Sequence, residues 1–183
     1  MIQFLPLPDM LTLADPAAFV ATFAGAGLVE PLRAGLAVAP VAALAILWRS
    51  PGRAGWAVAA LVAGLAGMLA ADRWESVTGL YDDRRIVIDE VAGFMAAMAV
   101  LGARGWRVTA ATAAAFLFLD RLKPWPFDRI EAVPGGAGVM LDDVAVGLAL
   151  GGLMMAAGML LSPAARDGSG PGSARPTQGG PQD

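Results

Sequence analysis

The chain has 183 residues, a formal net charge of −3, 57% hydrophobic residues and a mean hydropathy of +0.61, values at the membrane-protein end of the range for one compact unit. It contains no cysteine and no histidine, which excludes disulfides, thiolate nucleophiles, cysteine-based zinc sites and histidine acid–base chemistry. Any reaction must therefore use carboxylates, arginines, the one lysine, hydroxyls and a hard, oxygen-binding ion. We expect no nucleic-acid partner.

The first 33 residues precede the strong apolar runs. Residues 1–20 contain two acids and no basic residue, so they lack the positive segment of a secretory signal peptide, and we expect them not to be cleaved. Residues 21–33 are apolar and punctuated by glycine, then carry Glu30, Pro31 and Arg33. This pattern favours a loop or re-entrant turn over a spanning helix, the alternative being a flexible lead-in to the first helix.

Five apolar runs follow, and each predicts a helix: 34–48, 55–71, 91–103, 108–119 and 144–161. Most are shorter than the roughly 20 residues of a straight membrane span, so some could instead be buried helices of a compact bundle. The last run has 18 residues without a charge. We predict an all-α fold: a compact helical bundle, integral to the membrane, with about four to five apolar helices. Residues 162–183, rich in Ser, Gly and Pro, are predicted to be disordered.

Acidic residues are concentrated between these runs. Eleven of the 16 acids lie in residues 72–90 and 120–143. If all five runs cross the membrane, both segments and residues 1–33 face the same compartment. Seven basic residues lie on that side and six on the other, so the positive-inside rule does not orient the chain.

Two acidic pairs share a pattern in which a glycine follows within about one helical turn: Asp89-Glu90 with Gly93, and Asp142-Asp143 with Gly147. Such a glycine leaves room beside a carboxylate for an ion, a phosphate or a neighbouring helix. A carboxylate at the centre of a membrane helix costs about 2.5–3.5 kcal/mol, so the pairs must lie near the interface or be neutralised. A cation of the Mg²⁺ type, which also bridges to phosphates, would do so. The alternative for Asp142 is a helix N-cap, with Asp143 in the first turn.

Residues 118–143 form the candidate active-site loop. Asp120 closes one apolar run, Lys123 is the one lysine, and Gly135 and Gly136 loosen the backbone. These glycines could cradle a phosphate with backbone N–H groups. Upstream, the pair Asp82-Asp83 fits either a site or a solvated turn.

Four segments together resemble the bacterial phosphatidylglycerophosphatase A family: ATFAGAGL (21–28), DDRRIVIDEVAG (82–93), FLDRLKPWPFDR (118–129) and GGAGVMLDDVAVG (135–147). The resemblance covers about residues 18–160. It implies a domain over 18–161, after an N-terminal lead of 1–17 and before a tail of 162–183. It also implies an all-α, Mg²⁺-dependent enzyme of the bacterial inner membrane, with its active site facing the cytoplasm. Its substrate would be phosphatidylglycerophosphate in the bilayer, which loses its terminal phosphate to give phosphatidylglycerol.

The resemblance and the residue patterns together give the expected site. The metal ligands are expected to be Asp89, Glu90, Asp142 and Asp143. The catalytic residues are expected to be these four and Lys123. The substrate-binding residues are expected to be Asp82, Asp120, Arg121, Lys123, Gly135 and Gly136. A metal-activated water would attack the phosphate in line, direct attack by a carboxylate being the alternative.

The chain departs from the family at two places. After Gly27-Leu28 the family usually has a Pro-Gly-Thr turn, whereas this chain has residues 30–35, EPLRAG, and lacks that hydroxyl. Three residues before Asp120 the family often has an arginine, whereas this chain has Leu117. The competing class is a non-enzymatic membrane protein, a cation-transport or scaffold subunit whose acids line an ion path.

Overall fold

The computed structural model describes residues 1–47, 51–102, 105–122, 125, 127–131 and 133–161. The chain in these ranges is largely helical, so the prediction of an all-α fold is confirmed. The α-helices are α1 (Pro16–Ala21), α2 (Arg33–Leu47), α3 (Gly52–Thr78), α4 (Ile88–Leu101), α5 (Trp106–Leu122), α6 (Asp128–Glu131) and α7 (Gly136–Leu161). Lys123 and the predicted disordered tail lie outside the described residues.

A short antiparallel pairing near the N-terminus was not predicted. Strand β1 (Gln3–Phe4) pairs with β2 (Val29–Glu30), which follows a 3-10 turn, η1 (Ala26–Leu28). This pairing ties the first residues to the segment that enters α2. Residues 21–33 contain no helix that could span a membrane, as the sequence predicted.

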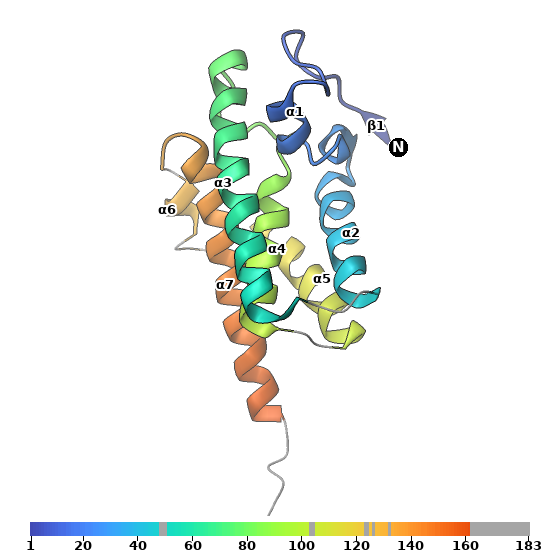
Figure 1. The fold of residues 1–183 in the computed structure, drawn as a ribbon, viewed down its shortest axis with the longest axis vertical. Helices are drawn as coiled ribbons and strands as arrows, with labels where there is room; N and C mark the ends of the chain where they lie inside the picture. The colour runs from blue at the N-terminus through green and yellow to red at the C-terminus, as the bar shows by residue number, and fades with distance from the viewer. Residues whose placement is uncertain (48–50, 103–104, 123–124, 126, 132, 162–183) are drawn as a thin grey trace, which may run out of the picture.

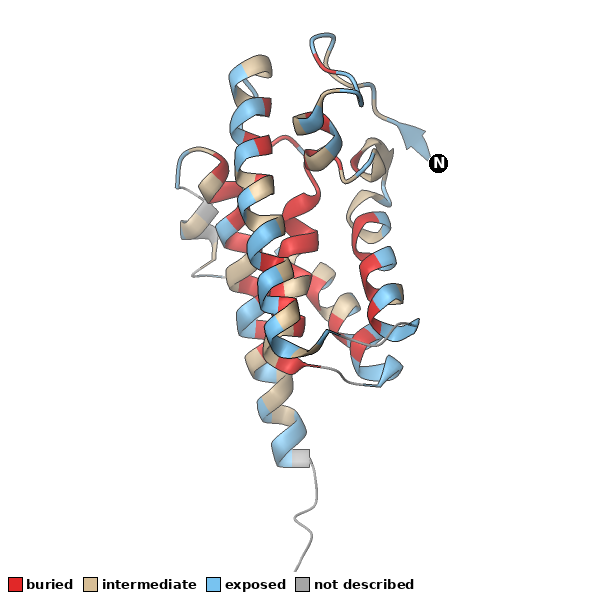
Figure 2. Ribbon diagram, viewed as in Figure 1, coloured by how far each residue is buried: buried red, intermediate tan, exposed pale blue. Residues whose placement is uncertain are grey.

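Helix α4 occupies the centre of the bundle (Figure 1). It packs against α3 and α7 on one side and against α2 and α5 on the other. Eleven of its 14 residues are buried, and Figure 2 shows buried positions along α4 while α3 exposes much of its surface. Both acids of the first acidic pair therefore start the most enclosed helix of the described chain.

Glycines allow α4 and α7 to touch. A Cβ on Gly147 would overlap the carbonyl oxygen of Gly93, and a Cβ on Gly93 would lie 2.6 Å from the carbonyl oxygen of Asp143. The space that the sequence left open for an ion, a phosphate or a helix is filled by a helix. Small residues have the same role in membrane helix pairs generally.

Helices α3 and α7, of 27 and 26 residues, are long and apolar enough to cross a membrane. Both expose apolar side chains, such as Leu61 and Leu65 on α3 and Leu148 and Leu153 on α7. Helix α2 is apolar but has 15 residues. Two helices thus meet the criteria for spans, and the further spans stay a prediction.

The observed helix α7 begins earlier than its apolar run. It starts at Gly136, so the alternative that made Asp142 a helix N-cap is wrong. The Gly136 N–H donates instead to Asp72 Oδ1 on α3, at 2.5 Å. Because a side chain of another helix satisfies this N–H, the glycine-rich segment joins the helix despite its low intrinsic propensity.

Candidate active site

A polar cleft of about 580 Å³ opens where several segments meet. The start of α2, the connection from α3 to α4, the first turn of α4, the end of α5 and α7 all contribute to it. Its charged lining residues are Arg33, Asp82, Arg84, Asp89, Glu90, Asp120, Arg121 and Asp143. The three segments that the span count placed on one side of a membrane therefore meet at one cleft.

Three carboxylates converge in this cleft. Asp89 and Glu90 come from the first turn of α4, and Asp143 comes from α7. One oxygen of each lies within 4.8 Å of the others. The residues are 9%, 7% and 1% exposed, respectively, so the cluster is held almost out of water.

The cluster fits a cation. Asp89 Oδ1, Glu90 Oε2 and Asp143 Oδ2 are buried and have no hydrogen-bond partner among the described residues. Buried polar atoms are normally satisfied, and three adjacent negative charges repel one another strongly in a medium of low dielectric. A bound cation would satisfy the oxygens and remove the repulsion. Three carboxylates with no nitrogen or sulfur ligand favour a hard ion such as Mg²⁺, Ca²⁺ or Mn²⁺.

Asp142 lies beside the cluster, outside the group of three. It is 1% exposed, and its Oδ1 accepts a hydrogen bond from the backbone N–H of Asp143 at 2.8 Å. Successive residues of a helix point about 100° apart, so its neighbour Asp143 faces α4 while Asp142 takes another direction.

The remaining predicted residues divide into three groups. Asp82, Asp120 and Arg121 line the cleft with the cluster. Gly135 and Gly136 are absent from its lining and pack against α3, where a Cβ on Gly136 would overlap the carbonyl oxygen of Met68. Lys123 lies outside the described residues.

Two cleft arginines were not predicted as site residues. Arg33 is the first residue of α2, and Arg84 lies between α3 and α4. Both lie 3.5 Å from Glu30 Oε1, and Arg33 Nη1 donates to the carbonyl oxygen of Arg84 at 2.6 Å. Their separation of 51 residues leaves no local motif. The available signal was the charged segment 30–35, where the chain departs from the family pattern.

Asp83 and Arg85 brace the connection that carries Arg84. Arg85 Nε donates to Asp83 Oδ1 at 2.9 Å and Arg85 Nη2 to Asp83 Oδ2 at 2.6 Å, a bidentate pair. Burial raises the pKa of Asp83, but the hydrogen bonds and charge of Arg85 outweigh it, so the net pKa of Asp83 is lowered. The hydrogen bond to Asp83 in turn raises the pKa of Arg85. Asp83 is thus part of a buried ion pair, and the solvated-turn alternative is wrong for it.

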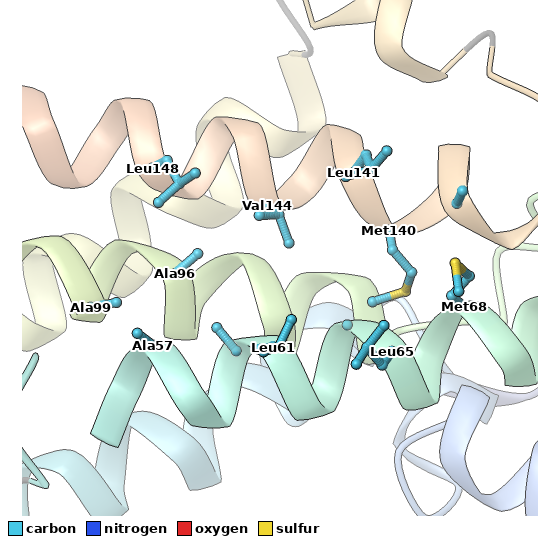
Figure 3. Close-up of a pocket in the computed structure, with 13 residues that line it drawn as sticks. Ala57, Leu61, Leu65, Met68, Ala96, Ala99, Met140, Leu141, Val144 and Leu148 are labelled. Atoms are coloured by element: carbon cyan, nitrogen blue, oxygen red, sulfur yellow. The ribbon is translucent and has the colours of Figure 1, made fainter. Parts of the chain in front are cut away.

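A second cavity, of about 370 Å³, lies between α3, α4 and α7 (Figure 3). Alanine, glycine, leucine, methionine and valine side chains line it, including Leu61, Met68 and Leu148. It offers no acid, base or charged group to a reaction. The polar cleft is therefore the candidate active site.

Two apolar helices long enough for a membrane, beside a buried carboxylate cluster that could hold a metal ion, define the class of a membrane-associated helical protein with a polar, acidic cleft. Residues 19–158 match the family model described as Phosphatidylglycerophosphatase A. The chain belongs to this family, and the resemblance seen in the sequence is confirmed.

Three curated relatives match parts of the chain. Phosphatidylglycerophosphatase A of Escherichia coli K12 is 38% identical over 79 residues, 42% of this chain and 45% of the relative. The Haemophilus influenzae protein of that name is 35% identical over 83 residues, 44% and 50% of the two chains. A Bacteroides thetaiotaomicron protein, provisionally named a phosphatidylinositol-3-phosphatase, is 38% identical over 98 residues, 51% and 60% of the two chains. The matches thus span about half the length of these relatives. No solved structure matches the chain.

Proposed function

We propose that this protein is a Mg²⁺-dependent lipid phosphatase that hydrolyses phosphatidylglycerophosphate to phosphatidylglycerol and phosphate in phospholipid biosynthesis. The observation that carries the proposal is the trio Asp89, Glu90 and Asp143, whose unpartnered buried oxygens meet in a cleft that also contains arginines. Family membership supports the choice of reaction.

The predicted site residues have distinct proposed roles. Asp89, Glu90 and Asp143 would hold the ion, and Asp142 would fix the backbone of Asp143 through its hydrogen bond. When bound, Mg²⁺ would polarise the phosphate and lower the pKa of a water ligand. Arg121 lines the cleft, where it would stabilise charge on the transferring group, and we assign the same role to Lys123.

The reaction is a hydrolysis at phosphorus. A water oxygen forms the new P–O bond and loses a proton, the bond from phosphorus to the terminal glycerol oxygen breaks, and the released glycerol oxygen gains a proton. Asp120, on α5, and Asp82 both line the cleft, and we assign to them the orientation of the headgroup. Attack by a carboxylate is the alternative mechanism. An acyl-phosphate would then form first and could be trapped, and solvent ¹⁸O would enter phosphate in the second step, when water hydrolyses this intermediate.

We place this domain, residues 18–161, in the bacterial inner membrane with the cleft at the cytoplasmic surface. The apolar outer surfaces of α3 and α7 support membrane contact. Helices α2, α4 and α5 would lie at the same depth, giving the predicted four to five apolar helices. The charged cleft would then meet lipid headgroups at the interface, where carboxylates are least costly.

Phosphate release from phosphatidylglycerophosphate in detergent micelles tests the proposal. Wild-type protein should release phosphate with Mg²⁺ and not with a chelator. Asp89→Asn should lower kcat/KM by about 100-fold or more, because even outer-shell partners of a metal typically contribute 10–100-fold. Glu75→Gln, an acid on α3 outside the cleft lining, is the matched control.

Two outcomes would contradict it. Full activity of Asp89→Asn would remove the carboxylate cluster from the mechanism. Faster release from phosphatidylinositol 3-phosphate than from phosphatidylglycerophosphate would change the substrate, the relation to the Bacteroides relative being the reason to include that lipid.

A further inference from the structure

Two arginines that contact each other line the same cleft as the carboxylate cluster, and their charge is opposite to that of the cluster. Arg33 and Arg84 both contact Glu30 Oε1 at 3.5 Å. Arg33 also holds the backbone of Arg84 through the 2.6 Å hydrogen bond to its carbonyl oxygen. Glu30 therefore brings two like charges together and offsets one of them, leaving a net charge of about +1. We call these three residues the arginine clamp.

The arginine clamp is accessible from the cleft. The side chains of Arg33 and Arg84 are 29% and 63% exposed, and both residues line the same cavity as Asp89 and Asp143. A guanidinium has five N–H donors in a planar fork, and the contacts described for Arg33 use one nitrogen. The clamp can therefore donate to an anion while keeping its internal contacts.

The anion that fits the clamp must belong to a molecule that also reaches the carboxylates. The carboxylate cluster repels any anion that no cation holds, so a second anionic group of the same molecule is favoured at the positive part of the cleft. Arginine forks match phosphate oxygens in geometry and charge. The lipid of the proposed reaction has two phosphate groups: the terminal monoester that is cleaved, and the diester that joins the headgroup to diacylglycerol.

We propose that Arg33 and Arg84, oriented by Glu30, bind the phosphodiester of the lipid headgroup and so favour substrates that carry this diester in addition to the phosphomonoester that is cleaved. This inference rests on the proposed function and adds the residues that determine specificity. It also gives the segment 30–35 a role in this chain, because the residue that begins α2 supplies a cation to the cleft.

Product inhibition separates the two phosphate positions. Phosphatidylglycerol keeps the diester and lacks the monoester, whereas inorganic phosphate resembles the monoester. In Mg²⁺-containing mixed micelles, Arg84→Ala should raise the KM for phosphatidylglycerophosphate and the inhibition constant of phosphatidylglycerol by about ten-fold, the loss expected for a charge-assisted contact. The inhibition constant of inorganic phosphate should not change.

The variants control for folding and for general charge. Arg33→Ala removes the other cation but also a backbone contact, so Arg84→Ala, whose side chain contacts Glu30 at the surface, is the primary variant. Arg84→Lys keeps the charge without the fork and should be intermediate. Arg73→Ala, an exposed arginine on α3 outside the cleft lining, should behave as wild type. Melting temperatures of all variants verify folding.

Each result leads to a decision. Unchanged phosphatidylglycerol inhibition in both alanine variants overturns the inference and leaves the proposed function standing. Equal weakening of inhibition by phosphatidylglycerol and by inorganic phosphate also overturns it, because the arginines would then act through the general field of the cleft. Wild-type protein that releases no phosphate from phosphatidylglycerophosphate overturns the proposed function, and the inference with it.

Discussion

Among single residues, Asp83 and Arg85 show how the chain stabilises the connection beside the cleft. The side chain of Asp83 is 5% exposed and that of Arg85 17% exposed. Arg85 also donates to the carbonyl oxygen of Pro6 at 2.7 Å and lies 5.6 Å from the centroid of the Trp74 ring. One guanidinium thus joins the N-terminal lead, α3 and the segment that carries Arg84.

Asp83→Asn should lower the melting temperature by about 3–6 °C, which corresponds to roughly 1–2 kcal/mol for a charged, partly buried hydrogen-bonded pair. The folded state lowers the pKa of Asp83, so this stabilisation is present above the unfolded value of about 3.9 and is lost as pH falls through the folded value. The difference between variant and wild type should therefore be full at neutral pH and narrow below about pH 4. Thermal unfolding in detergent across pH measures it.

Asp9→Asn, an exposed acid in the N-terminal lead, serves as the control and should leave melting unchanged. A difference that grows below pH 4 would contradict the sign of the pKa shift.

The sequence predicted which types of residue form the site, but it predicted only in part which of them come together in the fold. Two acidic pairs in apolar surroundings identified Asp89, Glu90 and Asp143 because charge there requires compensation. The spacing does not show which of Asp142 and Asp143 joins Asp89 and Glu90, because that depends on which face of α7 meets α4. The position of Gly136 against α3 is likewise a tertiary contact with no local signature.

At the scale of elements, the contact between α4 and α7 sets the distance between the carboxylates. Gly93 and Gly147 each follow their acids by about one turn. The backbone of Gly93 occupies the space where Gly147 would have a Cβ, and the carbonyl oxygen of Asp143 and the ring of Phe116 occupy the space where Gly93 would have one. The oxygens of the cluster can lie within 4.8 Å because the two helices approach at these glycines.

Gly147→Ala should reduce phosphate release by more than about ten-fold and destabilise the protein by about 1–3 kcal/mol, because the added methyl group must push α7 away from α4. Gly152→Ala, on the same helix, is the matched control, since nothing lies within 4 Å of a Cβ there. It should keep its activity and melt at the same or a slightly higher temperature, because alanine favours a helix over glycine. Initial rates and thermal melts on both variants measure this, and equal effects would show that helix separation is not the cause.

Helix positions followed from the sequence better than helix ends. The five apolar runs correspond to α2, α3, α4, α5 and α7. Apolar side chains must be buried or face lipid both in a compact bundle and in a membrane, so the runs mark the helices in either case. The sequence predicted that the last helix starts at residue 144, whereas α7 starts at Gly136. The prediction was wrong because glycines and acids normally indicate a loop. A cap from Asp72 and close packing on α3 compensate for that propensity.

For the whole molecule, the proposed metal site would couple metal binding to stability, because its ligands are buried carboxylates. Without a cation, the docking of α7 on α4 brings three buried acids together, which opposes folding. A ligand that binds only the folded state adds stability according to its concentration relative to Kd, about 2.7 kcal/mol at 100 times Kd.

Removing the metal should therefore lower the melting temperature, and Mg²⁺ should raise it well beyond an equal ionic strength of potassium chloride. Asp143→Asn should melt higher than wild type in chelator, because one repulsive charge is gone, and should lose most of the response to Mg²⁺. Thermal melts with a Mg²⁺ titration test both statements. A variant that is less stable than wild type in chelator, yet responds fully to Mg²⁺, would contradict the assignment of the cluster.

The division of the cluster between α4 and α7 also has a consequence for the order of events during synthesis. A ribosome-bound chain that has emerged only as far as α4 holds Asp89 and Glu90 on one helix. It lacks α7, and with it both Asp143 and the Gly147 surface that packs on α4. Under the proposed function, hydrolytic competence would arise in one step, when α7 docks on α4. A nascent chain would then be unable to hydrolyse lipid before that step.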